Sequence, residues 1–514
     1  MPSFYITTAI DYANGEPHLG HAFEKIGADA LARYHRLRGA DVWFLIGMDE
    51  HGQKVAQTAV ERGIAPQQLA DEIAESFRAM WRRLTISYDQ FIRTTDAQHA
   101  RGVRALIERM FERNSDDFYE KSYEGWYCVG CEQFKRENEI ADGKCVLHPT
   151  RTLEWTEERN WFFRLTRYQH FLERLFADRP DFLQPESRRN EMLALLASGL
   201  EDISVTRSRL SWAIPFPKPT STGEEQGTWV WFDALPNYLT ATGFPEATYS
   251  TRWPAQLHVI GKDIIRLHAA IWPAMLESAG LALPERIWAH GFVQLGGERF
   301  SKSAGVRLEL GSAIERYGPD AFRYFLLREV PFDGDGNFSW ERFAERYTAD
   351  LANAFGNLAS RALSMIERYR GGVVPEWRAD EPAPGSVVAE LLAERAVYAE
   401  AMEHQRIHDA LSAVWRSIAR ANEYVDHSAP WKLAKDPAMG AELDQVLATL
   451  AWLLAWHAVL TSPVMPGKAQ ALWRSLGAPG CVDAFRWTDQ DARHLINPTG
   501  WRVSKGEPLF PREA

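Results

Sequence analysis

Cysteine is scarce in this chain, and long hydrophobic runs are missing. Only four of the 514 residues are cysteines, and three of these lie between residues 128 and 145. A disulfide framework needs a higher density of cysteines and an export signal, whereas residues 1–20 contain neither Lys nor Arg nor a signal-peptide apolar core. The longest apolar run, residues 446–460, is too short for a bilayer and contains Thr449 and His457. We therefore expect a cytoplasmic protein with no membrane partner.

Positive charge is also in deficit. The chain has 58 Lys and Arg residues against 69 Asp and Glu residues, which gives a net charge of −11. Because phosphate contacts dominate non-specific nucleic-acid binding, this balance confines any nucleic-acid partner to a local basic face. The contents of 46% hydrophobic and 25% charged residues exclude a disordered chain, and the length predicts roughly three domains. Tryptophan is abundant, with 20 residues.

The order of apolar and helical patterns predicts an α/β fold. An apolar run at 4–10, a polar turn at 11–16, a helical pattern at 18–38 and a second apolar run at 42–46 are typical of a βαβ unit. Strand-like runs return at 228–232 and 257–260, after a cysteine-bearing segment at 121–157 that we expect to be rich in loops. After residue 349 the pattern is helical except for a loop at 371–385. The sequence thus predicts a Rossmann-type parallel sheet split by an insertion and followed by a helical domain.

The clustered cysteines have the spacing of a zinc site. Two residues separate Cys128 from Cys131, and Cys145 and His148 repeat that spacing after residues 132–144. Two such knuckles supply four ligands to one tetrahedral Zn²⁺ and leave no open position, so we expect one structural zinc ion per chain. A chance cluster of buried thiols is the alternative, and we expect no ligand role for Cys481.

Two short motifs fit the binding of a polyphosphate. His18 and His21 flank Gly20 where the first helix begins, and a helix N-terminus attracts anions. Residues 296–305 form a glycine-flanked loop with two basic residues, Arg299 and Lys302, suited to closing over phosphates. Taken singly, each motif also fits an ordinary surface feature, a capped helix or a solvated hairpin.

Together and in this order, the two motifs resemble the His-Ile-Gly-His and Lys-Met-Ser-Lys-Ser signatures of class I aminoacyl-tRNA synthetases. The second motif departs from that signature, with Arg299 in place of the first Lys and Phe300 in place of Met, so Lys302 carries more weight. The surrounding residues are similar to the methionyl-tRNA synthetase family along nearly the whole chain. The matching stretches are 6–21, 28–39, 49–54, 229–238, 260–264 with His268, 272–275, 290–292, 350–361 and 429–436.

This resemblance implies an enzyme that activates L-methionine with ATP, in the presence of Mg²⁺, to methionyl-adenylate. The methionyl group then passes to the 3′-terminal adenosine of methionine tRNA, initiator and elongator, with release of AMP and pyrophosphate. His18, His21 and Lys302 would be catalytic. Residues implied in ATP binding are His18, Gly20, His21, Gly261, Asp263, Val293, Arg299 and Lys302. Residues implied in methionine binding are Ile10, Tyr12, Asp49, Trp231, Ala234, Tyr238, Ile264 and His268, and the implied anticodon readers are Asn357, Arg361 and Trp431.

Composition alone favours a packing role for an aromatic strand at 229–232, and only the resemblance turns Trp231 into a pocket residue. A pocket of this kind discriminates against a missing methylene by only about 1–3 kcal/mol, so we expect measurable activation of norleucine or homocysteine.

From the same resemblance we expect six divisions of the chain and a monomeric protein. The expected divisions are 1–116 and 226–290 for the two halves of the Rossmann domain, 117–225 for the insertion, 291–349 for a stem-contact region, 350–475 for the anticodon-binding bundle and 476–514 for a tail. Three rival functions remain: another class I synthetase such as the cysteinyl enzyme, a tRNA-independent aminoacyl-adenylate ligase, and a non-catalytic zinc-knuckle RNA-binding protein. The closed zinc site argues against the first, the anticodon residues against the second and the two phosphate motifs against the third.

Overall fold

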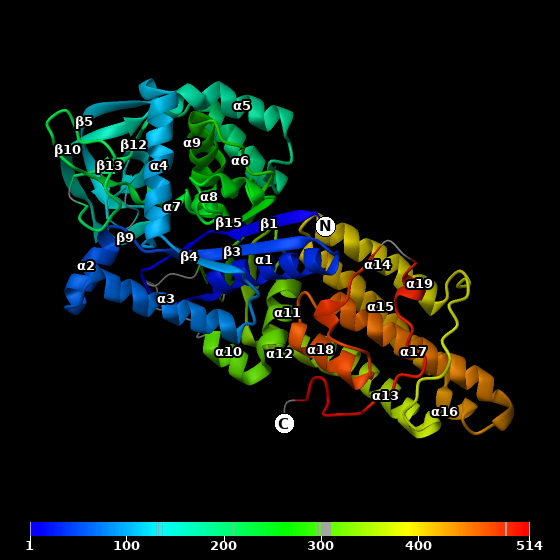
Figure 1. The fold of residues 1–514 in the computed structure, drawn as a ribbon. Helices are drawn as coiled ribbons and strands as arrows, with labels where there is room; N and C mark the ends of the chain where they lie inside the picture. Colours follow the sequence, from blue (N-terminus) through cyan, green and yellow to red (C-terminus); the bar gives the residue numbers. More distant parts are fainter. Residues whose placement is uncertain are drawn as a thin grey trace.

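Seven parallel strands form the central sheet of the N-terminal part (Figure 1). The computed structural model describes residues 2–129, 131, 133–135, 137–208, 210–295, 298–299, 310–488 and 491–512. The strand order is β11-β16-β15-β1-β3-β2, and β4 also pairs with β3. The strands are β1 (Ser3–Thr8), β2 (Asp11–Tyr12), β3 (Asp41–Asp49), β4 (Gln90–Arg93), β11 (Leu183–Gln184), β15 (Leu257–Gly261) and β16 (Ile287–His290). The predicted α/β fold class is confirmed.

Helices cover both faces of this sheet. Because side chains alternate along a strand, Tyr5 and Leu45 belong to one hydrophobic cluster, whereas their neighbours Ile6 and Phe44 belong to the other. In Figure 1 the helices α4, α8 and α9 lie on one side of the sheet and α1 and α3 on the opposite side. The helices of this part are α1 (Leu19–Leu37), α2 (Gln53–Arg62), α3 (Pro66–Arg83), α4 (Ala97–Arg113), α7 (Val230–Ala234), α8 (Asn237–Thr240) and α9 (Trp272–Ala279). Helix α1 ends before Gly39, whose φ of +84° suits glycine.

The inserted segment is more regular than the predicted loop-rich stretch. Strands β5 (Phe118–Cys128) and β10 (Glu154–Phe163) pair antiparallel along a continuous register, from Phe118 opposite Phe163 to Tyr127 opposite Glu154. Helix α5 (Gln169–Asp178) follows, then β11, which joins the edge of the central sheet beside β16, and then helix α6 (Glu186–Ala197). The short strands are β6 (Gln133–Phe134), β7 (Ile140–Ala141), β8 (Lys144–Cys145), β9 (His148–Thr152), β12 (Ile203–Ser204), β13 (Thr206–Arg207) and β14 (Gly227–Thr228).

The prediction of a strand at 228–232 is wrong. Strand β14 ends at Thr228, and the next residues form the helical turn α7, in which the Asp233 N–H donates to the Trp229 carbonyl oxygen at 3.0 Å. A short apolar run does not by itself distinguish a buried strand from a buried helix. Here the helical turn places Asp233 in the interior, where His51 and His99 bind its carboxylate, and this contact stabilises the turn.

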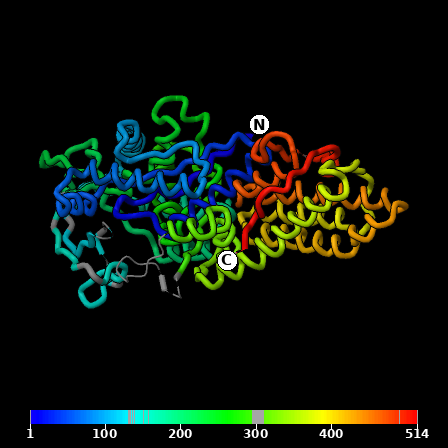
Figure 2. The backbone as a smooth tube through the Cα atoms, turned by 90° about the horizontal axis from the view of Figure 1, so that it is seen from below, coloured from blue at the N-terminus to red at the C-terminus, as the bar shows by residue number. Residues whose placement is uncertain are grey.

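The C-terminal part is helical, as predicted, and extends away from the sheet (Figure 2). Its helices are α10 (Leu310–Tyr317), α11 (Pro319–Glu329), α12 (Trp340–Arg346), a π-type helix (Tyr347–Gly356), α13 (Asn357–Arg370), α14 (Val387–Glu403), α15 (Ile407–Ser428), α16 (Pro430–Leu433), α17 (Gly440–Thr461), α18 (Pro466–Ser475) and α19 (Ala492–Leu495). A three-stranded sheet of β17 (Val293–Leu295), β18 (Glu298–Arg299) and β19 (Gly336–Phe338) precedes most of them. Within the described chain, one stretch, Pro437–Thr461, is long and apolar enough for a membrane, but 89% of its apolar window is buried in the protein. It is a core helix.

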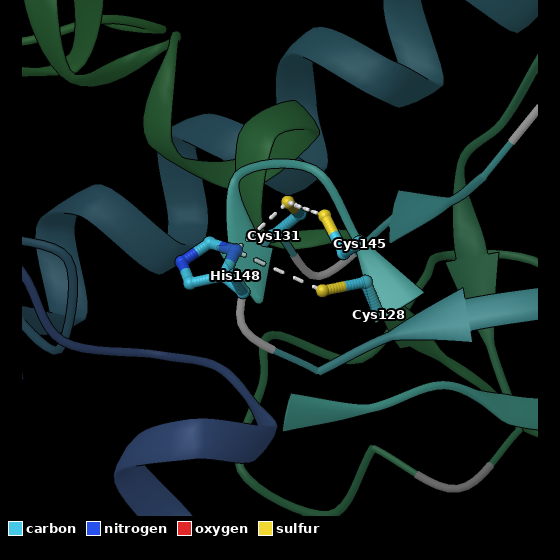
Figure 3. A group of neighbouring side chains, drawn as sticks. All are labelled: Cys128, Cys131, Cys145 and His148. Carbon is cyan, nitrogen blue, oxygen red and sulfur yellow. Dashed lines mark hydrogen bonds between the residues drawn. The ribbon is translucent and has the colours of Figure 1, made fainter. Parts of the chain in front are cut away.

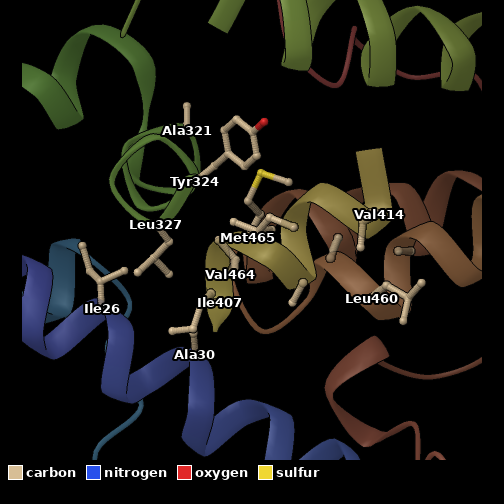
Figure 4. Close-up of a cluster of buried hydrophobic side chains, with 14 of the residues drawn as sticks. Ile26, Ala30, Ala321, Tyr324, Leu327, Ile407, Val414, Leu460, Val464 and Met465 are labelled. Atoms are coloured by element: carbon tan, nitrogen blue, oxygen red, sulfur yellow. The ribbon is translucent and has the colours of Figure 1, made fainter. Parts of the chain in front are cut away.

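The two parts share a continuous core (Figure 4). Ile26 and Ala30 of α1 face Leu327 of α11, and the same cluster continues to Ile407 of α15 and Val464 after α17. Arg323, completely buried, crosses this seam and donates to the carbonyl oxygens of Val464, Leu84 and Pro463 at 2.7, 3.1 and 3.0 Å. The sheet and the helical part are therefore joined by packing and by a satisfied buried cation.

Candidate active site, metal centre and RNA-reading face

The two predicted phosphate-binding histidines cap the first helix. His18 is the N-cap of α1: its Nδ1 accepts from the Gly20 N–H at 3.2 Å, and the His18 N–H donates to Nδ1 of His21 at 3.3 Å. The two rings stack with their centroids 3.6 Å apart. Because both Nδ1 atoms accept hydrogen bonds, the proton of each neutral ring lies on Nε2. The arrangement places two N–H donors at the positive end of a helix, which suits an anion.

A buried charge network that the sequence did not reveal lies directly beneath this helix end. The Lys25 ammonium group is completely buried and donates to Asp11, Glu24 and the Ala9 carbonyl oxygen at 2.9, 2.7 and 2.8 Å. The other Glu24 oxygen lies 3.2 Å from Nε2 of His290. Burial raises the pKa of Asp11 to about 7, and for Glu24 the charges of Lys25 and His290 outweigh burial and lower the pKa. The network fixes the spacing between β2, α1 and β16.

The predicted ribose and adenine contacts gather at the ends of β15 and β16. Gly261 lies opposite His290 in the sheet, and a Cβ at Gly261 would come within 2.7 Å of the Asp263 carboxylate, so a larger residue would force that carboxylate to turn away. Val293 is buried at the start of β17. Asp335, which the sequence did not single out, holds this corner by accepting from Lys262 at 2.6 Å and from the Phe292 N–H at 2.8 Å. Arg299 lies in strand β18, whereas Lys302 lies outside the described residues.

The predicted ammonium-binding acid, Asp49, lies at the C-terminal end of β3, where parallel sheets place their ligands. It is 4% exposed, and its backbone pairs with Tyr12 of β2. The loop that follows is held from several sides. Arg93 donates to the Glu50 carboxylate at 2.6 Å, and Trp212 binds the Glu50 carbonyl oxygen at 2.6 Å.

The predicted methionine-pocket residues surround one aromatic cluster. Ile10, Tyr12, Trp231 and Ile264 are partly exposed at its rim, and Ala234 and Tyr238 are buried. Tyr238 donates its hydroxyl proton to Nε2 of His268 at 2.7 Å, while Nδ1 of His268 donates to the Ile264 carbonyl oxygen at 3.0 Å. Burial lowers the pKa of His268 to about 4, so the ring is neutral near pH 7. The aromatic cluster therefore carries no net charge on its imidazole.

The four predicted zinc ligands meet at one point (Figure 3). Their ligand atoms all lie within 4.8 Å of one another: the Sγ atoms of Cys131 and Cys145 are 3.6 Å apart, and Nδ1 of His148 is 3.2 Å from Cys131 and 3.8 Å from Cys128. Tetrahedral Zn²⁺ with normal bond lengths requires separations of about 3.6–3.8 Å, so the donor set fits. Hydrogen bonding to Cys131 lowers the pKa of Cys128, which favours the thiolate form that binds a metal. Among the described residues this is the one group with metal-ligand geometry, and Cys481 is exposed elsewhere.

Two of the three predicted anticodon readers lie against each other on the helical part. The Arg361 guanidinium of α13 lies 5.9 Å from the centre of the Trp431 ring, which is 38% exposed at the start of α16. Asn357 is exposed one turn before Arg361 on the same helix. Asp426, which the sequence did not single out, accepts from Arg361 at 2.5 Å. An exposed ring beside a cation is suited to stacking on an unpaired base.

Comparisons with known proteins agree along the whole chain. Residues 4–363 match the family of class I tRNA synthetases (M), and residues 374–512 match the anticodon-binding domain of methionyl tRNA ligase. A methionine–tRNA ligase of Caldanaerobacter subterraneus is 42% identical over 99% of this chain and 79% of its own length, and one of Streptomyces coelicolor is 40% identical over 99% and 96%. The structure of the Mycobacterium tuberculosis methionyl-tRNA synthetase in complex with methionyl-adenylate superposes with a TM-score of 0.91, at 40% identity, over 100% of both chains. The free form of that enzyme gives a TM-score of 0.86.

Proposed function

The chain belongs to the methionyl-tRNA synthetase family and catalyses methionine activation and tRNA charging, and we propose that its residues divide this work between the sheet edge and the helical face. ATP would lie across the ends of β15 and β16, with its ribose at Gly261 and Asp263 and its adenine against the backbone at Val293. The N-terminus of α1 supports the phosphate end of this placement, because a helix N-terminus attracts anions and His18 and His21 cap this one.

The first step is an attack of the methionine carboxylate on the α-phosphorus of ATP. A carboxylate oxygen–phosphorus bond forms, the bond to the β-phosphate oxygen breaks, and pyrophosphate leaves with the electron pair. No protein nucleophile takes part, so positioning and charge stabilisation supply the rate. His18 and His21 would stabilise the phosphates, Lys302 and Arg299 would bind the leaving pyrophosphate, and Mg²⁺ bound with ATP would offset phosphate charge.

Methionine would be held by its two ends. The buried carboxylate of Asp49 would bind the α-ammonium group, and the side chain would enter the aromatic pocket of Ile10, Tyr12, Trp231, Ala234, Tyr238, Ile264 and His268. The neutral state of His268 supports this assignment, because an imidazolium would disfavour an apolar thioether side chain.

In the second step the 2′-hydroxyl of the terminal adenosine of methionine tRNA attacks the acyl carbon. The ester bond forms, the acyl–phosphate bond breaks, and AMP leaves. Asn357, Arg361 and Trp431 would read the anticodon of initiator and elongator methionine tRNA, and the Arg361–Trp431 contact supports this role.

The metal would act away from the chemistry. Cys128, Cys131, Cys145 and His148 would bind a single structural Zn²⁺ that holds the inserted hairpin together, because four protein ligands leave no position for a substrate. The six divisions of the chain, a monomeric state and a cytoplasmic location complete the proposal.

Three observations support the proposal: His18 caps the first helix, the buried Asp49 ends β3, and the neutral His268 lies beside Tyr238 in the aromatic cluster. The test is ATP–pyrophosphate exchange with each amino acid in turn, followed by charging of methionine tRNA. We expect exchange with methionine far above that with cysteine, and charging that requires the methionine anticodon. Preferential exchange with cysteine, or exchange without any charging, would contradict the proposal.

A further inference from the structure

A buried histidine–aspartate–histidine chain joins the two ends of the proposed methionine site. Asp233 of α7 is completely buried, and each of its carboxylate oxygens faces one imidazole: Nδ1 of His51 at 2.6 Å and Nε2 of His99 at 2.8 Å. His51 follows Asp49 by two residues, in the loop after β3, and Asp233 lies between Trp231 and Ala234. One carboxylate therefore connects the loop of the ammonium-binding acid to the helix that forms the pocket wall.

The second histidine anchors this connection to the helices behind it. Nδ1 of His99 in α4 lies 2.7 Å from the Thr240 hydroxyl of α8, and Gln98 donates to the Thr240 carbonyl oxygen at 3.1 Å. Helices α4 and α8 approach so closely at Gly102 that a Cβ there would come within 2.4 Å of the Thr240 methyl group. The His99 end of this hydrogen-bonded chain is thus held by close packing between α4 and α8.

The surroundings of Asp233 favour its ionised form. Burial by itself raises the pKa of Asp233, but the two histidines outweigh it and lower the pKa, so the carboxylate is ionised. For His51, burial is outweighed by Asp233 and Glu50, which raise its pKa. An ionised acid between two N–H donors, one of them on a ring that gains a proton readily, is a strong and directional link.

We propose that Asp233 is a positioning residue that couples Asp49 to Trp231, so that the two ends of methionine are bound by one preorganised unit. This inference rests on the proposed function and adds a residue that touches neither substrate nor the reacting atoms. Because Asp233 acts on the methionine side alone, its loss should weaken methionine binding and leave ATP binding intact. A misplacement of about 1 Å in such a site costs on the order of 100-fold.

The test compares three variants in pyrophosphate exchange, with methionine binding measured by calorimetry in the absence of ATP. For Asp233→Asn, which keeps the shape and removes the charge, we expect the methionine KM to rise about 10- to 100-fold and the ATP KM to stay within about twofold. His51→Gln should raise the methionine KM in the same direction, and the double variant should be no worse than Asp233→Asn, because both changes break one link.

Asp117→Asn is the matched control. Asp117 is also a buried carboxylate, bound by Ser278 at 2.7 Å and by Tyr168 and Arg167, but it lies at the start of the insertion. It should lower thermal stability without changing the methionine KM.

An unchanged methionine KM in Asp233→Asn, or an equal rise of both KM values, would overturn the positioning role. If Asp233→Asn does not fold, the methionine KM and the ATP KM of His51→Gln alone test the positioning role. A wild-type protein without methionine-dependent exchange would instead contradict the proposed function.

Discussion

The two regions that we propose to bind substrate are built in opposite ways. At the sheet edge, the polar groups are buried and bind one another, as in the Asp11–Lys25–Glu24–His290 network, and Tyr238 is 1% exposed. On the helical face, Trp431 is 38% exposed and Arg361 pairs with an exposed aspartate. A small flexible substrate demands a preformed site, whereas an RNA loop brings bases that stack on whatever ring is exposed. Changes at the sheet edge should therefore affect chemistry, and changes on the helical face should affect RNA affinity alone.

Zinc removal should have the largest effect. A structural zinc site contributes on the order of 10 kcal/mol to the folding of the segment that it holds, so a chelator should unfold the inserted hairpin. We expect amide protons of β5 and β10 to lose protection from hydrogen exchange, while α15 and α17 keep theirs. An insertion that remains folded and metal-free would contradict the structural role.

Replacement of Lys302 tests whether chemistry depends on the sheet edge and its closing loop. Lys302→Ala removes a cation from the leaving pyrophosphate, so pyrophosphate exchange should fall about 100- to 1,000-fold, as for other lost charge-stabilising groups. Methionine affinity, measured by calorimetry, should stay near normal. Lys435→Ala, at an exposed lysine on the helical part, is the control and should leave exchange unchanged. An unchanged exchange rate in Lys302→Ala would remove this residue from the site.

Much of the fold and of both regions could be predicted because the signals are local. The His18–His21 pair, the Cys and His spacing and the βαβ order each lie within a short stretch of sequence. The apolar run at 228–232 was ambiguous, because the helical turn that forms there brings Asp233 to His51 and His99, which are more than 130 residues away in the chain.

The internal charge networks could not be predicted for the same reason. Lys25 and Glu24 read as ordinary polar residues of an amphipathic helix, and only the fold brings Asp11 and His290 to them. Likewise, Asp335 reaches Lys262 from 73 residues away. A buried charged residue has no recognisable local sequence pattern when its partner is distant in the chain. The abundance of tryptophan was equally uninformative about burial, since Trp126 and Trp155 are 44% and 56% exposed on the insertion.

Trp431→Ala tests the helical face. The loss of one stacked base should lower affinity for the isolated anticodon stem-loop of methionine tRNA by about 1–3 kcal/mol, as measured by fluorescence anisotropy. Adenylate formation should be unaffected, because the ring lies outside the sheet-edge site. Trp155→Ala, at the exposed ring of the insertion, is the control and should not change stem-loop binding. A loss of adenylate formation in Trp431→Ala would break the separation between the two regions.

The smallest effect should come from replacing Asp426, the aspartate that pairs with Arg361. The exposed Arg361–Asp426 pair contributes only about 0.2–1 kcal/mol to stability, so Asp426→Asn should leave thermal unfolding nearly unchanged. It removes a negative charge beside Arg361 and Trp431, so stem-loop affinity should rise by up to about fivefold, most clearly at low salt. Arg370 lies on α13 like Arg361, and it pairs with Asp444. Asp444→Asn breaks that more distant pair and should change stem-loop affinity less. A decrease in affinity for Asp426→Asn would show instead that the carboxylate orients Arg361 for reading, which would make the helical face preorganised like the sheet edge.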